Sequence, residues 1–173
     1  MGMDNRNRDL EKAISDYGDA IYRSCLLMLR NKEDAEDVVQ EVFFKFMVSK
    51  KQFESEDHKK SWLFKVCQNK CRNFIRFHRR HNYVPFEEIE NIIGGVEDIA
   101  LKEDREELQE IYNLTNNLKS VVILYYVDGY STEEISKILG ISTSAVRKRM
   151  QRAREILKIR IEENKEGDLV YEY

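Results

Sequence analysis

One proline and seven glycines stand among the 173 residues of this chain. An all-β protein needs many tight turns, which these two residues favour, and this chain has too few of them. Apolar residues instead recur at three- and four-residue steps, as in Leu10, Ile14 and Tyr17, which predicts amphipathic helices. Charged residues make up 35% of the chain and hydrophobic residues 42%, enough for long solvated faces and a core. We therefore expect an all-α fold.

The first half of the chain shows three helical segments. The first covers residues 9–30, the second follows Asn31, which can cap it, and the third covers residues 59–80. Residues 50–58 are polar and have no apolar stripe, so we expect a loop between the second and third helices.

The helical pattern stops at residues 82–97, which hold the only proline, Pro85, and the pair Gly94-Gly95. Such a stretch is typical of an interdomain linker. We therefore expect two small helical domains, residues 1–82 and 98–173, joined by a flexible linker at 83–97. The acidic tail 162–173 is expected to be disordered, with a docking segment as the alternative.

The second half of the chain carries a helix-turn-helix pattern. Helical spacing returns over residues 98–115 and 117–127. Ser131 and Glu134 fit a capping box, and a short helix follows to Leu139. Gly140 supplies the turn, and Ser142 can cap a longer basic helix that starts at residue 143. This order predicts a second domain that binds DNA.

Charges are strongly segregated along the chain, although the net charge is only −3. Residues 33–41 hold five acids and no base, and residues 59–81 hold eight bases and no acid. Residues 147–160 hold seven bases against Glu155 alone. Two basic blocks on two helices indicate two nucleic-acid surfaces; the alternative is that each block is only a solvated face.

The longer basic helix presents the side chains that can read DNA. Val146 and Met150 are four residues apart and must face inward to close the helix-turn-helix. Base readers are then expected among Ser144, Arg147, Lys148 and Gln151, and Arg149 and Arg152, which border the inward stripe, are expected on phosphates. The full predicted set is Ser142, Ser144, Arg147, Lys148, Arg149, Gln151 and Arg152.

Three segments together resemble the bacterial sigma factors of RNA polymerase, in the small extracytoplasmic-function group. Residues 34–43 (DAEDVVQEVF) resemble the polymerase-binding segment, residues 62–69 (WLFKVCQN) the minus-ten helix, and residues 130–154 the minus-thirty-five helix-turn-helix. The order and spacing also match. The resemblance implies an initiation factor that binds core RNA polymerase, recognises promoter DNA and helps to melt it, with an anti-sigma factor as a further partner.

The resemblance also assigns site residues. It places polymerase contacts on the acidic helix, at Asp34, Asp37, Gln40 and Glu41. It places Phe53 at the aromatic position of the loop that holds a flipped base, although Phe53 can equally anchor that loop to the core, and Trp62 is expected in the core. Minus-ten contacts are expected from side chains on the exposed face of the third helix: Lys65, Gln68, Asn69, Arg72, Asn73 and Arg76.

Some matches are imperfect. Residues 117–120 lack the proline and arginine common in the family, Asn73 stands where aspartate is common, and Ser144-Ala145 replaces a usual glycine-threonine. These departures bear on which promoter sequences are read.

We expect no enzyme activity, no cofactor and no metal. Cys67, Cys71, His78 and His81 look like a zinc quartet, but one helix spreads them over ~21 Å, too far for one ion. A redox-sensing pair of Cys67 and Cys71 remains an alternative. An odd cysteine number, no signal peptide and no membrane span indicate the cytoplasm. The competing functions are a helix-turn-helix regulator that acts without polymerase, and a helical adaptor that binds no DNA.

Overall fold

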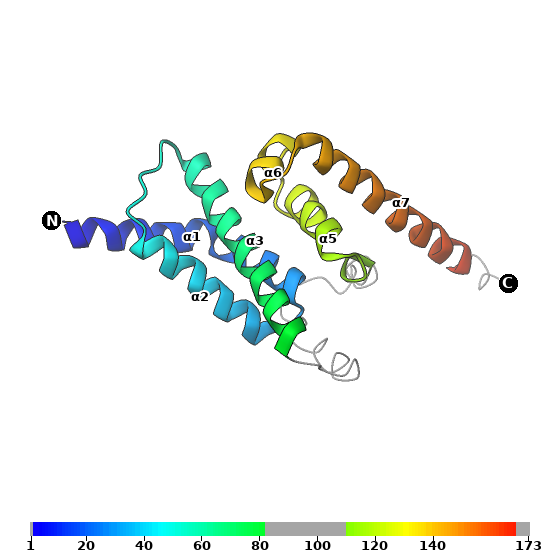
Figure 1. Cartoon of the computed structure of the whole chain (residues 1–173), viewed down its shortest axis with the longest axis horizontal. Coiled ribbons are helices and arrows are strands. Elements are labelled where there is room, and N and C mark those ends of the chain that lie inside the picture. The colour runs from blue at the N-terminus through cyan, green and yellow to red at the C-terminus, as the bar shows by residue number, and fades with distance from the viewer. Residues whose placement is uncertain (1, 82–109, 169–173) are drawn as a thin grey trace.

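The computed structural model describes residues 2–81 and 110–168, and every regular element in these two ranges is a helix. The helices form two groups that lie against each other (Figure 1). The all-α class and the helix-turn-helix of the second group are confirmed. The predicted linker and the end of the acidic tail, residues 169–173, lie outside the described residues, so the domain boundaries stay a prediction.

The first group is a bundle of α1 (Gly2–Leu29), α2 (Lys32–Val48) and α3 (Glu56–His81), and each of the three helices packs against the other two. Arg30 has a left-handed backbone, with φ of 58°, which ends α1 and turns the chain. The Asn31 side chain then accepts a hydrogen bond from the Asp34 N–H at 3.0 Å and caps α2, as predicted.

The third helix begins earlier than predicted. The expected loop at 50–58 ends at Ser55, whose Oγ accepts a hydrogen bond from the His58 N–H at 3.1 Å. Glu56 and Asp57 lie in the first turn, where the helix dipole favours acids. This start was missed because an apolar stripe does not begin until Trp62, whereas the cap and the acids act earlier.

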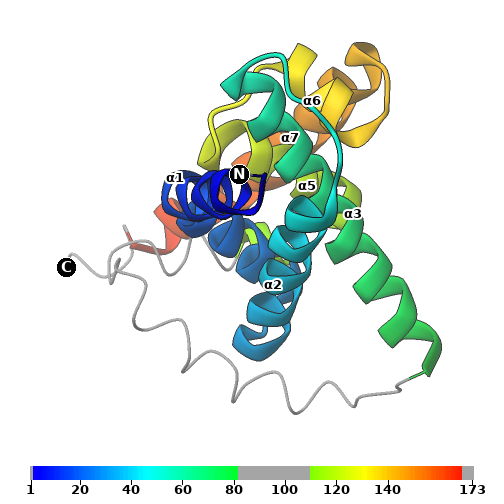
Figure 2. The same ribbon diagram turned by 90° about the vertical axis from the view of Figure 1, so that its left-hand side faces the viewer.

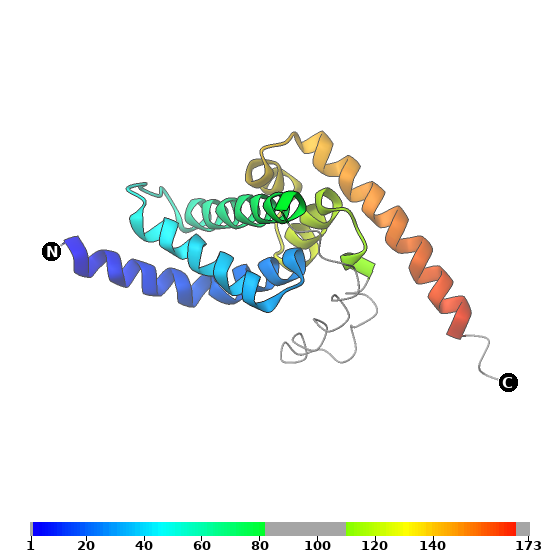
Figure 3. The same ribbon diagram turned by 60° about the horizontal axis from the view of Figure 1, so that its bottom comes forward.

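The second group contains α5 (Asn116–Val122), the π-helical turn η3 (Ile123–Val127), α6 (Thr132–Leu139) and α7 (Thr143–Asp168). The capping box is complete: the Ser131 N–H donates to Glu134 Oε2 at 2.8 Å, and the Glu134 N–H donates to Ser131 Oγ at 3.2 Å. The α7 helix extends away from the rest of the molecule (Figure 3). Of the helix predicted at 98–115, only residues 110–115 are described.

The two groups share a continuous apolar core, and α6 lies along α3 (Figure 2). Phe64 of α3 meets the Tyr130 ring edge-on, with 5.2 Å between centroids. The Ser24 hydroxyl of α1 donates to Asp128 Oδ2 at 2.7 Å. In this closed arrangement, the second group therefore covers one side of the first.

Candidate nucleic-acid interface

The helix-turn-helix is built as the sequence predicts. Gly140 has a φ of 67° and turns the chain between the helices, in a conformation that favours glycine. The Ser142 Oγ accepts a hydrogen bond from the Ala145 N–H at 3.1 Å and caps α7. Ile135, Val146 and Met150 are buried between α6 and α7. The second helix is thus held rigidly, as base recognition requires.

The predicted readers on α7 face solvent. Arg147 pairs with Glu133 of α6 at 3.3 Å, and Gln151 donates to Glu155 at 3.2 Å, and both are exposed contacts that DNA can replace. Arg149 is half-buried, consistent with its predicted place beside the inward stripe. The remaining predicted readers are exposed, namely Ser142, Ser144, Lys148 and Arg152.

The basic face of α3 is largely, but not wholly, exposed. Arg72 is half-buried and donates to Asn69 Oδ1 at 2.6 Å. Burial lowers the pKa of Arg72, and the charges of Arg76 and Arg149 lower it further. Because α6 packs against both α3 and α7, the two basic surfaces lie on neighbouring parts of the molecule. Exposed members of the predicted α3 set are Lys65, Asn69, Asn73 and Arg76.

The structure corrects the prediction for Gln68. It was expected on the exposed face, but its side chain is fully buried, and neither Oε1 nor Nε2 has a hydrogen-bond partner. Gln68 lies one helical turn after Phe64, on the side of α3 that faces Tyr130. Sequence periodicity within one helix could not reveal this burial, because burial depends on which other helices pack against α3.

Phe53 lies in an aromatic cluster. Its ring stacks on Phe46, with 5.9 Å between centroids, and meets Trp62 edge-on at 5.5 Å. Phe53 and Trp62 are half-buried, so Phe53 anchors the 49–55 loop in this structure, and Trp62 packs with the core as expected. A contact between Phe53 and an extruded base stays a prediction.

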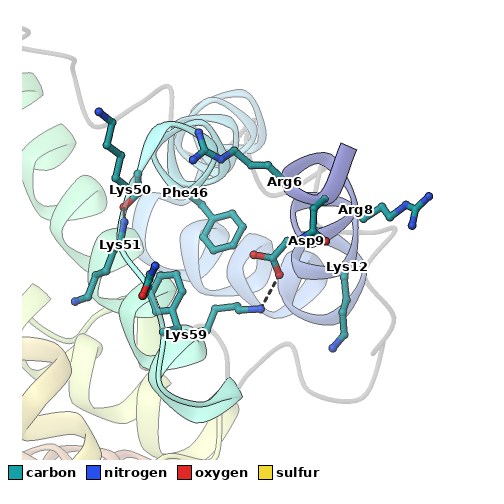
Figure 4. A pocket seen from close by; sticks show the side chains of 12 residues that line it. Arg6, Arg8, Asp9, Lys12, Phe46, Lys50, Lys51 and Lys59 are labelled. Carbon is teal, nitrogen blue, oxygen red and sulfur yellow. Dashed lines mark hydrogen bonds and ion pairs between the residues drawn. The ribbon is translucent and has the colours of Figure 1, made fainter. Parts of the chain in front are cut away.

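A cavity of about 1000 Å³ opens beside this loop (Figure 4). Phe46 forms part of its wall, and Lys59 reaches across to Asp9 at 2.8 Å. Its basic lining residues come from α1, the loop and α3: Arg6, Arg8, Lys12, Lys50, Lys51 and Lys59. Sequence reasoning missed the α1 residues, although Arg6 and Arg8 stand out in the polar opening MGMDNRNRDL.

The predicted polymerase-binding surface lies on the N-terminal half of α2, between Asp34 and Glu41. Asp37, Gln40 and Glu41 are exposed, and Asp34 is half-buried. Burial raises the pKa of Asp34, with the charges of its acidic neighbours adding to the effect and that of His78 opposing it. Glu41 forms an ion pair with Lys70 of α3, with 2.6 Å between Oε2 and Nζ. The exposed Asp37 on the same helix can pair with a basic partner.

Two ionisable groups, the half-buried Asp128 and the buried Lys119, lie between the halves of the closed arrangement. Burial raises the pKa of the Asp128 carboxyl to about 6, against the lowering effects of the Ser24 hydrogen bond and the charges of Arg23 and Lys60. Asp128 Oδ1 has no hydrogen-bond partner. On α5, burial lowers the pKa of Lys119 to about 8, and the charges of Arg30 and Arg79 add to the effect. Burial therefore disfavours the charged form of each group relative to water.

Comparison with known proteins covers both halves of the chain. Residues 13–81 match the family model described as Sigma-70 region 2, and residues 108–157 match that described as Sigma-70, region 4. The RNA polymerase sigma factor SigV of Bacillus subtilis is 28% identical over 152 residues, covering 88% of this chain and 90% of that protein. ECF RNA polymerase sigma factor SigW of the same organism is 30% identical over 155 residues, covering 82% and 83%.

Solved structures show the same fold. The sigma factor RpoE of Bartonella quintana, in complex with the anti-sigma factor NepR, matches with a TM-score of 0.72 at 18% identity, over 90% of this chain and 98% of that one. CnrH, in complex with the cytosolic domain of CnrY, matches with a TM-score of 0.64 at 21% identity, over 90% and 89%. Among the described residues of this chain, none of the helices is both long and apolar enough to cross a membrane.

Proposed function

Because the chain belongs to the extracytoplasmic-function group of the sigma-70 family, it is a transcription initiation factor that binds core RNA polymerase, and we propose how its surfaces divide that work. The α2 acids bind polymerase, the basic face of α3 holds the minus-ten strand, and α7 reads the minus-thirty-five element. Sigma factors act as initiation factors rather than as catalysts. The observation that carries this division is the separation of one acidic and two basic surfaces onto three different helices.

The cavity beside the 49–55 loop extends the minus-ten surface. Its six basic side chains can hold phosphates of a melted strand, while Phe46 and Phe53 supply apolar surface for a base. Asp9 and Glu56 pair with Lys59, and Glu56 also pairs with Lys12; six bases against these two acids still give the cavity a positive lining. We propose Arg6 and Arg8, which line this cavity, as DNA contacts in addition to the set predicted from the sequence.

The promoter-bound form differs from the closed arrangement. Two promoter elements about two helical turns apart lie ~70 Å from each other, whereas α3 and α7 both pack against the short helix α6 in this structure. One molecule cannot place both surfaces on their elements in this state. The α3–α6 contact must therefore open when the protein joins polymerase and DNA.

An anti-sigma partner is inferred from the two solved relatives described above, each of which was solved in complex with its partner. We place the protein in the cytoplasm, where bacterial polymerase and promoter DNA are found. A regulator acting without polymerase is not favoured, because its relatives along most of the chain are sigma factors and because the α2 acids would have no role in it.

Run-off transcription with purified core polymerase on a genomic fragment library tests the function. Dyes at Glu33 on α2 and Lys137 on α6, both exposed, test the opening by energy transfer. We expect efficient transfer in the free protein and a fall when core polymerase and promoter are added together. Promoter-specific transcripts with unchanged transfer would leave the function standing and contradict the opening, whereas an absence of transcripts at any promoter would contradict the function.

A further inference from the structure

All three cysteines of the chain converge in the core of the first helical group. Cys25 lies on α1, and Cys67 and Cys71 lie one turn apart on α3; each is 0% exposed. The Sγ atoms of Cys25 and Cys67 are 3.4 Å apart, and all three sulfurs lie within 4.8 Å of one another. The partner of the α3 pair is thus Cys25, 42 residues away in sequence, and not the histidines that follow on α3.

The sulfurs interact strongly with one another. Hydrogen bonds from Cys25 and Cys67 lower the pKa of Cys71, because two donors stabilise one thiolate. Hydrogen bonding with its two neighbours, together with burial, raises the pKa of Cys67. The charge of Asp128 also acts on Cys25, in the direction that raises its pKa. The three thiols therefore form one buried cluster.

We propose that Cys25, Cys67 and Cys71 form a three-coordinate thiolate site for a trivalent thiophilic ion, arsenic(III) or antimony(III). Soft thiolate ligands select soft ions. A structural zinc site needs a fourth ligand, and the cluster offers three His, Cys, Asp or Glu ligand atoms among the described residues. Trivalent arsenic is satisfied by three sulfurs.

The net charge of the complex distinguishes the ions that three thiolates could bind. Three thiolates with a monovalent or divalent cation leave a net negative charge, whereas three thiolates with a trivalent ion form a neutral complex. Burial of an unpaired charge is costly, and all three cysteines are fully buried. Ile21 and Leu63, one turn before Cys25 and Cys67, are also fully buried. A neutral complex suits this environment.

The binding reaction balances without any redox partner. Arsenous acid, As(OH)₃, reacts with three thiols: three S–H and three As–O bonds break, and three As–S bonds and three O–H bonds form. The products are the tris-thiolate and three water molecules. No electron is transferred, and each thiol proton leaves in a water molecule. The site is closed in the folded core, so α1 and α3 must separate locally before the ion enters.

Titration of the full chain with sodium arsenite, in a phosphine reductant that offers no competing thiol, tests the site. We expect one arsenic per chain by native mass spectrometry, loss of all three free thiols, and an absorption-edge spectrum with three sulfur neighbours around arsenic. Because the chain has three cysteines in total, each lost thiol can be assigned to this cluster. Zinc chloride at the same concentration should neither bind nor displace arsenite.

The matched variant is Cys25→Ala, which keeps a small side chain in a buried position and leaves the α3 pair intact. We expect its arsenite affinity to fall tenfold or more, with retained helicity by circular dichroism and no third sulfur in the spectrum. The sulfur count around arsenic is measured on the wild type, so a folding defect in the variant does not affect that result. Loss of only two thiols in the wild type, equal affinity in the Cys25→Ala variant, preferred zinc binding, or no arsenite binding would each overturn the site.

Discussion

Lys148 is the residue whose role in promoter choice can be isolated most cleanly. Its side chain is exposed on α7 and has no ion pair among the described residues. If it reads a base edge, Lys148→Ala will cost ~1–3 kcal/mol at one promoter position. Arg152→Ala, also at an exposed position, should weaken binding at all sequences alike and flatten the salt dependence. A randomised minus-thirty-five library transcribed by each holoenzyme measures both; identical preferred sequences for wild type and Lys148→Ala would make Lys148 a backbone contact.

Gln68 predicts a stability gain at a single buried residue. Its amide has two unsatisfied atoms in the closed arrangement, and an unsatisfied buried polar group costs about 1–3 kcal/mol. Gln68→Met has a similar shape and no such group, so we expect the free energy of unfolding to rise by ~1–2 kcal/mol. Chemical denaturation measures it. Asn73→Met, at an exposed position of the same helix, should change stability by less than ~0.5 kcal/mol. A loss of stability in Gln68→Met would contradict the burial.

At the scale of the element, the predicted polymerase contact lies on the exposed face of α2. Asp37 is exposed and free of the Lys70 ion pair that engages Glu41. Asp37→Lys should weaken core polymerase binding, because opposed charges across the interface become like charges. A pull-down with core polymerase measures it. The control is Asp19→Lys, the same reversal at an exposed position on α1; equal binding by both variants would remove α2 from the interface.

Elements set by local chemistry could be predicted from the sequence. The Asn31 cap, the capping box at Ser131 and the turn at Gly140 each depend on a few neighbouring residues, and each was found where expected. The start of α3 was missed, because capping and first-turn acids outweigh the absence of an apolar stripe. The π-helical turn η3 leaves no signal in apolar spacing.

Contacts between distant segments could not be predicted from the sequence. The burial of Gln68 depends on α6, and the cysteine cluster depends on how α1 lies against α3. The basic cavity likewise joins α1 to the 49–55 loop. Charge segregation located the surfaces on α3 and α7, but not their mutual approach in the closed form.

At the scale of the whole molecule, Lys119 predicts a pH dependence. Its pKa is about 8 in the folded protein against an ordinary 10.5, so between these values the unfolded chain binds more protons than the folded one. The free energy of unfolding must therefore rise with pH across this window, by up to ~3 kcal/mol, and the penalty of the buried charge is fully present below pH 8.

Chemical denaturation of the wild type and Lys119→Met at a series of pH values measures this contribution. Since Met cannot carry a charge, the rise between pH 8 and 10.5 should be smaller in the variant, and the variant should be the more stable protein at pH 7. Parallel curves for the two proteins would show that Lys119 does not carry the effect.

The polar atoms between the two groups of helices also bear on how the chain is made. During synthesis the first group leaves the ribosome before the second is complete, so the face of α3 around Phe64 and Gln68 is exposed to water for some seconds. Ser24 and Gln68 can bind water there until α6 and η3 arrive. A wholly apolar face at this position would favour self-association of nascent chains, so we expect the Gln68 amide, which is unsatisfied in the finished protein, to limit that association during synthesis.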